Sequence, residues 1–239
     1  MFAIIKRELR ALIFSWRAYA FVAIFAVCSC ALRLMYNFMS LYDSIYGFIN
    51  HEYILTFLPA ALALAVPVLT FSAYENERKN ETFSFLRSLP LKATDIIFGK
   101  YLAFVALFGA VYAVMTLIDV ILGFYTGTDI LTAILSVICF LLLANVILAV
   151  NMLFSAVFKN RYAALGAGYA VSAVLIALTA TRYFMPMLIN NVITQASVFG
   201  SYTSVLFGLL DISSVVLWLS LGGLFIYLYY LVMKKEIKL

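Results

Sequence analysis

Charged residues are scarce in this 239-residue chain, in which they make up 11% of the residues while apolar residues make up 66%. A soluble domain usually carries about 25% charged and about 45–50% apolar residues. The interior of a soluble domain could not hold this apolar excess, and the remainder would face water. The scarcity of charge therefore excludes an ordinary soluble domain and predicts one membrane domain over residues 1–239.

The residue types that carry most enzyme chemistry are nearly missing as well. His51 is the single histidine, and Cys28, Cys30 and Cys139 lie in apolar runs without the spacing of metal ligands. We find no Ser-His-Asp set, paired carboxylates or histidine-rich cluster. A phosphate-binding G-x-x-x-x-G-K-[ST] loop is missing too, since Gly99-Lys100 lacks the upstream glycine and the following serine or threonine. The sequence predicts a chain that is not an enzyme and binds no cofactor or metal itself.

Long apolar runs dominate instead. Runs of about 18 or more apolar residues are typical of helices that cross a bilayer, because a helix satisfies its backbone hydrogen bonds within one segment. Six such runs predict an all-α membrane protein with six spans. They cover residues 18–36, 54–73, 101–124, 130–158, 162–181 and 212–233.

Lysine and arginine gather on one side of these predicted spans. If the N-terminus lies in the cytoplasm, only Arg33 and Arg182 of the 16 basic residues fall outside. The positive-inside rule then predicts a multi-pass protein of the cell membrane with both termini in the cytoplasm. The net charge of +5 accordingly marks a membrane face and predicts no binding to nucleic acid.

Residues 1–17 predict a helix that lies on the membrane surface and leads into the first span. Apolar residues recur there with helical spacing between basic ones, at Phe2, Ile5, Leu9, Leu12 and Ile13. A basic anchor without a further role fits the same pattern.

Charge is concentrated in one stretch, residues 75–100, which holds nine of the 16 basic and 11 acidic residues. Within it, Thr82, Phe85, Leu86 and Leu89 fall at i, i+3, i+4 and i+7 and form one face of a short helix, which a proline then ends. Such a helix can dock a soluble partner, lie on lipid headgroups or cover the inner mouth of the bundle, and the pattern leaves these open.

The motifs of this stretch are ERKNET at residues 77–82, FL at 85–86, SLP at 88–90 and IIFGKYLA at 96–103. They resemble the first cytoplasmic loop of ABC type-2 transporter permeases, which commonly reads E-R-x-x-G-T, a leucine-rich turn, S-P and G-K-x-L. Glu81 stands where those permeases often have glycine. The last span, FGLLDISSVVLWLSLGGLFIYLYYLVMKK, is similar to that of the branch with gliding-motility and nitrous-oxide-reductase-maturation permeases.

The resemblance implies the permease subunit of an exporter, paired with a second copy or a sister permease and binding two cytoplasmic ATPase subunits. The partner would bind ATP and Mg, and the short helix would be the coupling helix that sits in a cleft of the ATPase. The residues carried over to this coupling role are Glu77, Arg78, Thr82, Phe85, Leu86 and Leu89. The substrate, whether lipid-like, a peptide or a drug, is not indicated.

The resemblance also implies that the apolar external segment at residues 182–211 dips back into the membrane as a re-entrant helical segment before the last span. A segment this long and this apolar does not suit free exposure to water.

Three polar residues inside the spans are candidates for a translocation path, because polar groups in hydrocarbon are costly. Asp119 either lines an external vestibule or lies hydrated at headgroup depth. Asn145 and Asn151 either face the path or bond across helices.

Two other functions fit a six-span protein. An ATP-independent secondary transporter would show matched inverted halves with interrupted helices, and no matched pair of interruptions is visible. A non-transporting scaffold or sensor, with or without an ATPase, leaves no distinguishing mark in the sequence.

Overall fold

The computed structural model describes residues 2–46, 58–74, 93–126, 130–180, 197–199, 202 and 212–238. Within these ranges the chain forms seven helices and no strand, which confirms the all-α prediction for this part of the chain. The helices are α1 (Phe2–Ile13), α2 (Trp16–Tyr46), α3 (Leu58–Thr70), α6 (Ala93–Thr126), α7 (Ile130–Val157), α8 (Arg161–Ala180) and α11 (Ile212–Lys238).

Four of these helices, α6, α7, α8 and α11, are long and apolar enough to cross a membrane. Helices α1 and α2 meet the same test only as a pair, bent by 68°. Among the described residues the structure therefore supports four or five spans by length and composition, where the sequence predicted six.

The second predicted span, residues 54–73, is represented by the short helix α3. Its 13 residues rise about 20 Å, less than the hydrocarbon thickness of about 30 Å. Residues 54–57 lie outside the described ranges. The helix continues through Pro67 to Thr70, and the Tyr169 hydroxyl of α8 donates to the Leu64 carbonyl near this proline at 3.2 Å.

Ser15 separates the surface helix α1 from α2. Its hydroxyl donates to the Leu12 carbonyl at the end of α1 (2.7 Å) and accepts from the Ala18 amide in the first turn of α2 (3.4 Å). A serine that ends one helix and caps the next allows a sharp change of direction. The surface helix predicted over residues 1–17 thus ends at Ile13, before the bend.

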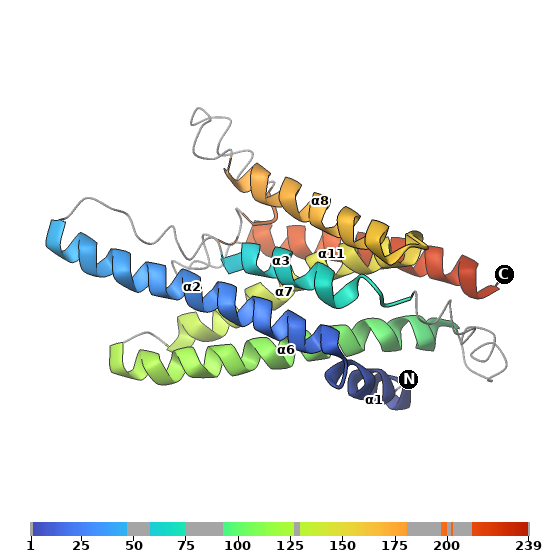
Figure 1. Ribbon diagram of the computed structural model, residues 1–239, viewed down its shortest axis with the longest axis horizontal. Coiled ribbons are helices and arrows are strands. Elements are labelled where there is room, and N and C mark those ends of the chain that lie inside the picture. The colour runs from blue at the N-terminus through green and yellow to red at the C-terminus, as the bar shows by residue number, and fades with distance from the viewer. Residues whose placement is uncertain are drawn as a thin grey trace.

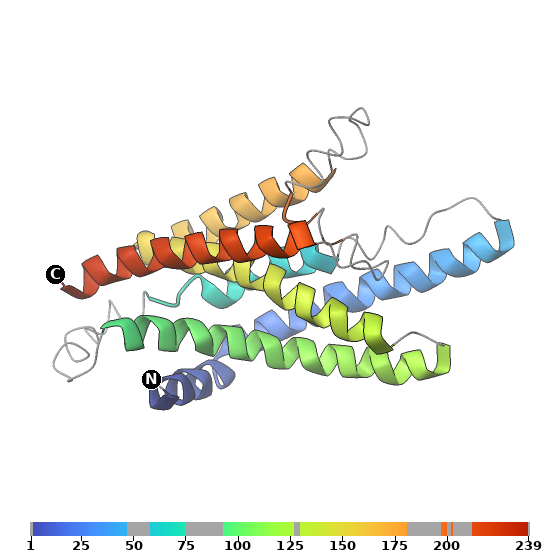
Figure 2. The same ribbon diagram turned by 180° about the vertical axis from the view of Figure 1, so that it is seen from behind.

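Both chain termini, the end of α3 and the start of α6 lie at one end of the bundle (Figures 1 and 2). We call it the basic end, because most of the chain's lysines and arginines adjoin the helix ends gathered there. Those with described side chains are Lys6, Arg7, Arg10, Arg17, Lys100, Lys159, Arg161, Lys234 and Lys235.

Helix α7 forms the centre of the bundle, where it packs against α3, α6, α8 and α11. An aromatic cluster surrounds its Phe140, which is fully buried. The centroid of the Phe140 ring lies 4.0 Å from the ring centroid of Tyr112 on α6 and 6.2 Å from that of Phe25 on α2. Aromatic stacking of this kind adds to the burial of apolar surface and holds the three helices together.

Four residues of the predicted re-entrant segment are described, and all four, Ser197, Val198, Phe199 and Tyr202, are buried. The Trp218 indole of α11 donates to the Val198 carbonyl at 3.0 Å, and the Tyr202 ring lies 5.8 Å from Phe140. Phe140 lies about 15 Å along α7 from the start of that helix. This part of the segment therefore packs inside the bundle, while the rest of residues 182–211 lies outside the described ranges and its re-entrant helix stays a prediction.

Two glycines allow α8 and α11 to approach the asparagines of α7. A Cβ atom at Gly168 would clash with Asn151 Oδ1 and lie 3.3 Å from Pro67 Cβ. A Cβ atom at Gly222 would lie 3.1 Å from Asn145 Nδ2. Small residues at such points let membrane helices pack closely.

We predict that Gly168→Ala destabilises the bundle by about 1–3 kcal/mol, because the added methyl group overpacks the contact with Asn151. Gly166→Ala on the same helix is the matched control, since nothing lies within 4 Å of its Cβ position. That variant should be neutral or slightly stabilising. The midpoint of thermal unfolding in one detergent compares the two, and equal midpoints would contradict the close packing of α8.

Candidate functional site

The ends of the predicted coupling loop are both described. Helix α3 ends at Thr70, and a turn over residues 71–74 leads into residues 75–92, which lie outside the described ranges. Helix α6 begins at Ala93. Contacts between the turn after α3 and the first turns of α6 hold these two ends of the loop.

Lys100 of α6 ties the two ends together. Its side chain is buried, and its Nζ donates to the Ala73 carbonyl at 2.6 Å. The same Nζ lies 4.2 Å from the centroid of the Tyr74 ring. A buried ammonium needs such partners, and both come from the turn after α3.

Two tyrosines extend this tie to α11. Tyr229 Oη donates to the Ile97 carbonyl in α6 at 3.5 Å, and Tyr74 Oη is hydrogen-bonded to Tyr229 Oη. Tyr74 and Tyr229 are both buried. We call the set of Ala73, Tyr74, Ile97, Lys100 and Tyr229 the loop anchor, since it joins α3, α6 and α11 at the base of the loop.

Tyr101, next to Lys100, continues the polar contacts into α7. Its hydroxyl donates to Asn145 Oδ1 at 2.6 Å and lies 3.2 Å from the Asn145 carbonyl oxygen. The Tyr101 and Tyr229 rings are also in contact, with centroids 6.2 Å apart. Adjacent residues of α6 therefore connect the loop anchor to the central helix.

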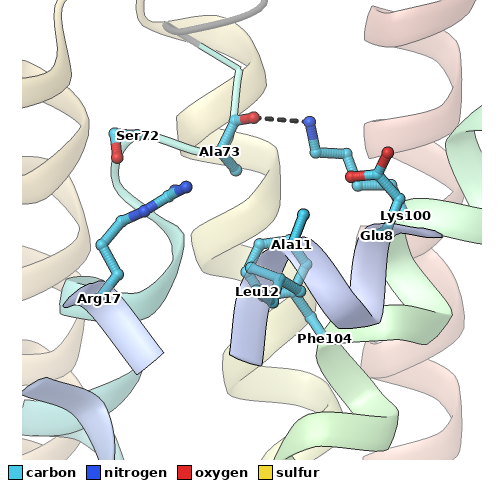
Figure 3. Close-up of a pocket in the computed structure, with 8 residues that line it drawn as sticks. All are labelled: Glu8, Ala11, Leu12, Arg17, Ser72, Ala73, Lys100 and Phe104. Atoms are coloured by element: carbon cyan, nitrogen blue, oxygen red, sulfur yellow. Dashed lines mark hydrogen bonds between the residues drawn. The ribbon is translucent and has the colours of Figure 1, made fainter. Parts of the chain in front are cut away.

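Helix α1 lies against this part of α6, where the Cβ position of Gly99 is 2.9 Å from Ile4. Between α1, α2, α3 and α6 a cavity of about 110 Å³ remains. Figure 3 shows Arg17 and Lys100 at this cavity, with the hydrogen bond from Lys100 to Ala73 at its edge. Its lining residues are Glu8, Ala11, Leu12, Arg17, Ser72, Ala73, Lys100 and Phe104.

The coupling residues proposed from the sequence are not described by the structure. Glu77, Arg78, Thr82, Phe85, Leu86 and Leu89 all belong to residues 75–92. Their role stays a prediction, and the structure supplies only the anchor from which their segment departs.

Two of the three candidates for a translocation path, Asn145 and Asn151, have described side chains. Asp119 belongs to α6, but its side chain is not described. Asn145 bonds to Tyr101 and adjoins Gly222, whereas Asn151 is buried, donates to the Ile147 carbonyl at 2.8 Å and adjoins Gly168. The two asparagines thus have different neighbours, and both take part in helix packing.

The loop anchor was missed in the sequence. A lysine at the start of an apolar span reads as a residue of the membrane surface, and Tyr74 and Tyr229 read as ordinary interfacial tyrosines. The one available signal is that Lys100 stands between the apolar residues Ile96, Ile97 and Phe98 and the predicted span at residues 101–124. Across the described ranges, no three His, Cys, Asp or Glu side chains lie close enough to hold a metal ion.

Comparison with protein families gives one match that spans nearly the whole chain. The model of the family described as "ABC-2 family transporter protein" matches residues 2–239. Comparison with curated proteins gives no match.

We predict that Lys100→Met lowers the free energy of unfolding by about 1–3 kcal/mol, because it leaves the buried Ala73 carbonyl without its charged donor. Lys159→Met is the matched control, since Lys159 is exposed between α7 and α8. Thermal unfolding of both variants in one detergent measures the difference, and an unchanged midpoint for Lys100→Met would contradict the anchor.

Proposed function

Since the chain belongs to the ABC-2 family of transporter proteins, we propose that it is the membrane-spanning permease subunit of an ATP-driven exporter. The family match over residues 2–239 carries this proposal, and it confirms the resemblance drawn from the motifs of residues 77–103. The apolar helices α6, α7, α8 and α11 agree with a transporter component of the membrane.

Membership of this family implies an ABC ATPase as partner. We propose that two ATPase copies bind at the basic end and that they, not this chain, hold ATP and Mg. A second permease subunit, identical or a sister chain, completes the transporter. The cell membrane is the proposed location, with both termini in the cytoplasm.

The proposed contact with the ATPase is the apolar face of Thr82, Phe85, Leu86 and Leu89, with Glu77 and Arg78 at its entrance. The loop anchor supports this role, because the segment that carries these residues departs from two fixed points. Lys100 holds the start of α6 to the turn after α3. A displacement of the segment therefore moves α3 and α6 together rather than bending a free loop.

From the anchor, we propose that the displacement reaches the centre of the bundle by two contacts. The bond from Tyr229 to Ile97 passes it to α11, and the bond from Tyr101 to Asn145 passes it to α7. Buried polar contacts have few alternative arrangements, so they favour a shift between discrete packings over continuous bending.

We retain Asp119, Asn145 and Asn151 as proposed residues of the translocation path. In the described arrangement Asn145 adjoins Gly222 of α11, so it would reach a substrate only when α7 and α11 separate. The class of substrate, lipid-like, peptide or drug, follows from none of these contacts.

The proposed coupling predicts that the tagged chain, extracted from its native membrane in mild detergent, brings down an ABC ATPase. Phe85→Asp and Leu86→Asp should each abolish this co-purification, because a carboxylate would enter the apolar contact. Mass spectrometry of the eluate identifies and quantifies the partner.

Ser84→Asp and Ser88→Asp are matched controls, since they place the same charge on the opposite face of the predicted helix. Both should retain the ATPase. If no ATPase accompanies even the wild-type chain, a secondary transporter or a scaffold without a motor replaces the exporter. If all four variants retain it, the coupling face is wrong.

The proposed orientation predicts the behaviour of reporter fusions. Alkaline phosphatase, which is active only outside the cytoplasm, should be active when fused after Asn190 and inactive when fused after Lys235. A fluorescent protein that matures only in the cytoplasm should show the reverse pattern. Activity of the phosphatase after Lys235 would place the basic end outside and overturn the orientation.

A further inference from the structure

A groove of about 520 Å³ borders the surface helix α1. The described residues that line it are Lys6, Arg7, Arg10, Ala11 and Phe14. Three of these five residues carry a positive charge and none carries a negative one. We call this feature the α1 groove.

The basic side chains of the groove point away from the bundle because the opposite face of α1 is buried. Leu12 is 5% exposed, and Ile5 and Leu9 pack against the hydrophobic core. Lys6, Arg7 and Arg10 are exposed. The amphipathic pattern of α1 thus fixes which face is open to a ligand.

Aromatic side chains adjoin the groove at the bend between α1 and α2. Phe14, which lines it, is 76% exposed, and Trp16 is 65% exposed. Tryptophan side chains of membrane proteins are enriched at the level of the lipid headgroups. A ligand in the groove therefore meets positive charge and an apolar ring together, as an amphiphile requires.

We propose that the α1 groove binds the headgroup of an anionic phospholipid, with its phosphate among the three basic side chains and its acyl chain against Phe14. Arginine presents a planar fork of donors that matches a phosphate group. An inorganic anion would gain nothing from Phe14, and an acidic protein surface would leave the exposed Phe14 and Trp16 rings without an apolar partner. An anionic lipid satisfies both halves of the groove.

Arg7 forms an ion pair with Glu8 of the same helix, with 2.6 Å between Nη2 and Oε1, and this pair offsets part of its positive charge. Lys6 and Arg10 therefore carry most of the attraction. The bundle side of the same helix contacts α6, where the Cβ position of Gly99 is 2.9 Å from Ile4.

The test is a titration of the detergent-solubilised chain with phosphatidylglycerol and with phosphatidylcholine, followed by native mass spectrometry. Wild type should bind phosphatidylglycerol more tightly. Each basic residue near a membrane surface contributes about fivefold, and Arg7 contributes less because of Glu8, so the triple variant Lys6→Gln, Arg7→Gln, Arg10→Gln should weaken it by at least about 25-fold. Its affinity for phosphatidylcholine should hardly change.

The matched control is Lys159→Gln, Lys234→Gln, Lys235→Gln, which removes as many charges at the same end of the bundle and should keep the preference. Equal weakening by both triple variants would reveal diffuse surface charge and overturn the site. The same holds if wild type shows no preference between the two lipids.

Two further measurements separate a lipid from a simple anion. Phe14→Ser should weaken both lipids several-fold, because it removes the contact with the acyl chain. Excess inorganic phosphate should leave the bound lipid in place, and displacement by phosphate would overturn the lipid assignment. If the triple variant does not fold, the affinity of wild type for the two lipids is measured at rising salt concentration. Screening should weaken the binding of phosphatidylglycerol alone, and an unchanged affinity would contradict the proposal.

Discussion

The hydrogen bond from the Lys100 ammonium to the Ala73 carbonyl holds the end of α3 against the start of α6. An ammonium group among apolar side chains is costly unless a dipole or an aromatic face receives it. The turn after α3 supplies both, through Ala73 and the Tyr74 ring. The burial of one charge thus sets where the segment 75–92 leaves the bundle and returns to it. The orientation of α11 is linked to the same place, because Tyr229 bonds to Tyr74 and Ile97.

The same constraint governs the polar residues of α7. An amide side chain inside a helix bundle needs hydrogen-bond partners within the bundle, and each asparagine has one. Asn145 accepts from Tyr101, and Asn151 donates to the Ile147 carbonyl of its own helix. Each also adjoins a glycine of a neighbouring helix, Gly222 or Gly168, where a Cβ atom would crowd the amide group. The sequence interpretation was a bond across helices. Asn145 makes such a bond with Tyr101 of α6, whereas the described bond of Asn151 stays within α7.

Continuous apolar runs made most of the fold predictable. Helices α7 and α11 begin at Ile130 and Ile212, the residues at which the apolar runs begin. The second predicted span, residues 54–73, runs past the end of α3 at Thr70, because an apolar run shows that a segment avoids water and not where its helix ends. The loop anchor could not be predicted, since its bonds join residues 27, 132 and 155 positions apart and no local pattern records such contacts. The family motifs predicted a coupling role for residues 77–89 but not the contacts that hold the ends of that segment.

Two adjacent residues of α6, Lys100 and Tyr101, make contacts on different sides of that helix. Lys100 bonds outward to the turn that precedes the coupling segment, and Tyr101 bonds inward to Asn145 on α7. A one-residue step along a helix turns the side chain by about 100°, so two adjacent residues can reach two different helices. Helix α6 therefore connects the surface proposed for the ATPase to the centre of the bundle without an intervening loop. A displacement of residues 75–92 would act first on α3 and α6. It would reach the contact between Asn145 and Gly222 afterwards. At that contact α7 and α11 would have to separate before Asn145 could meet a substrate.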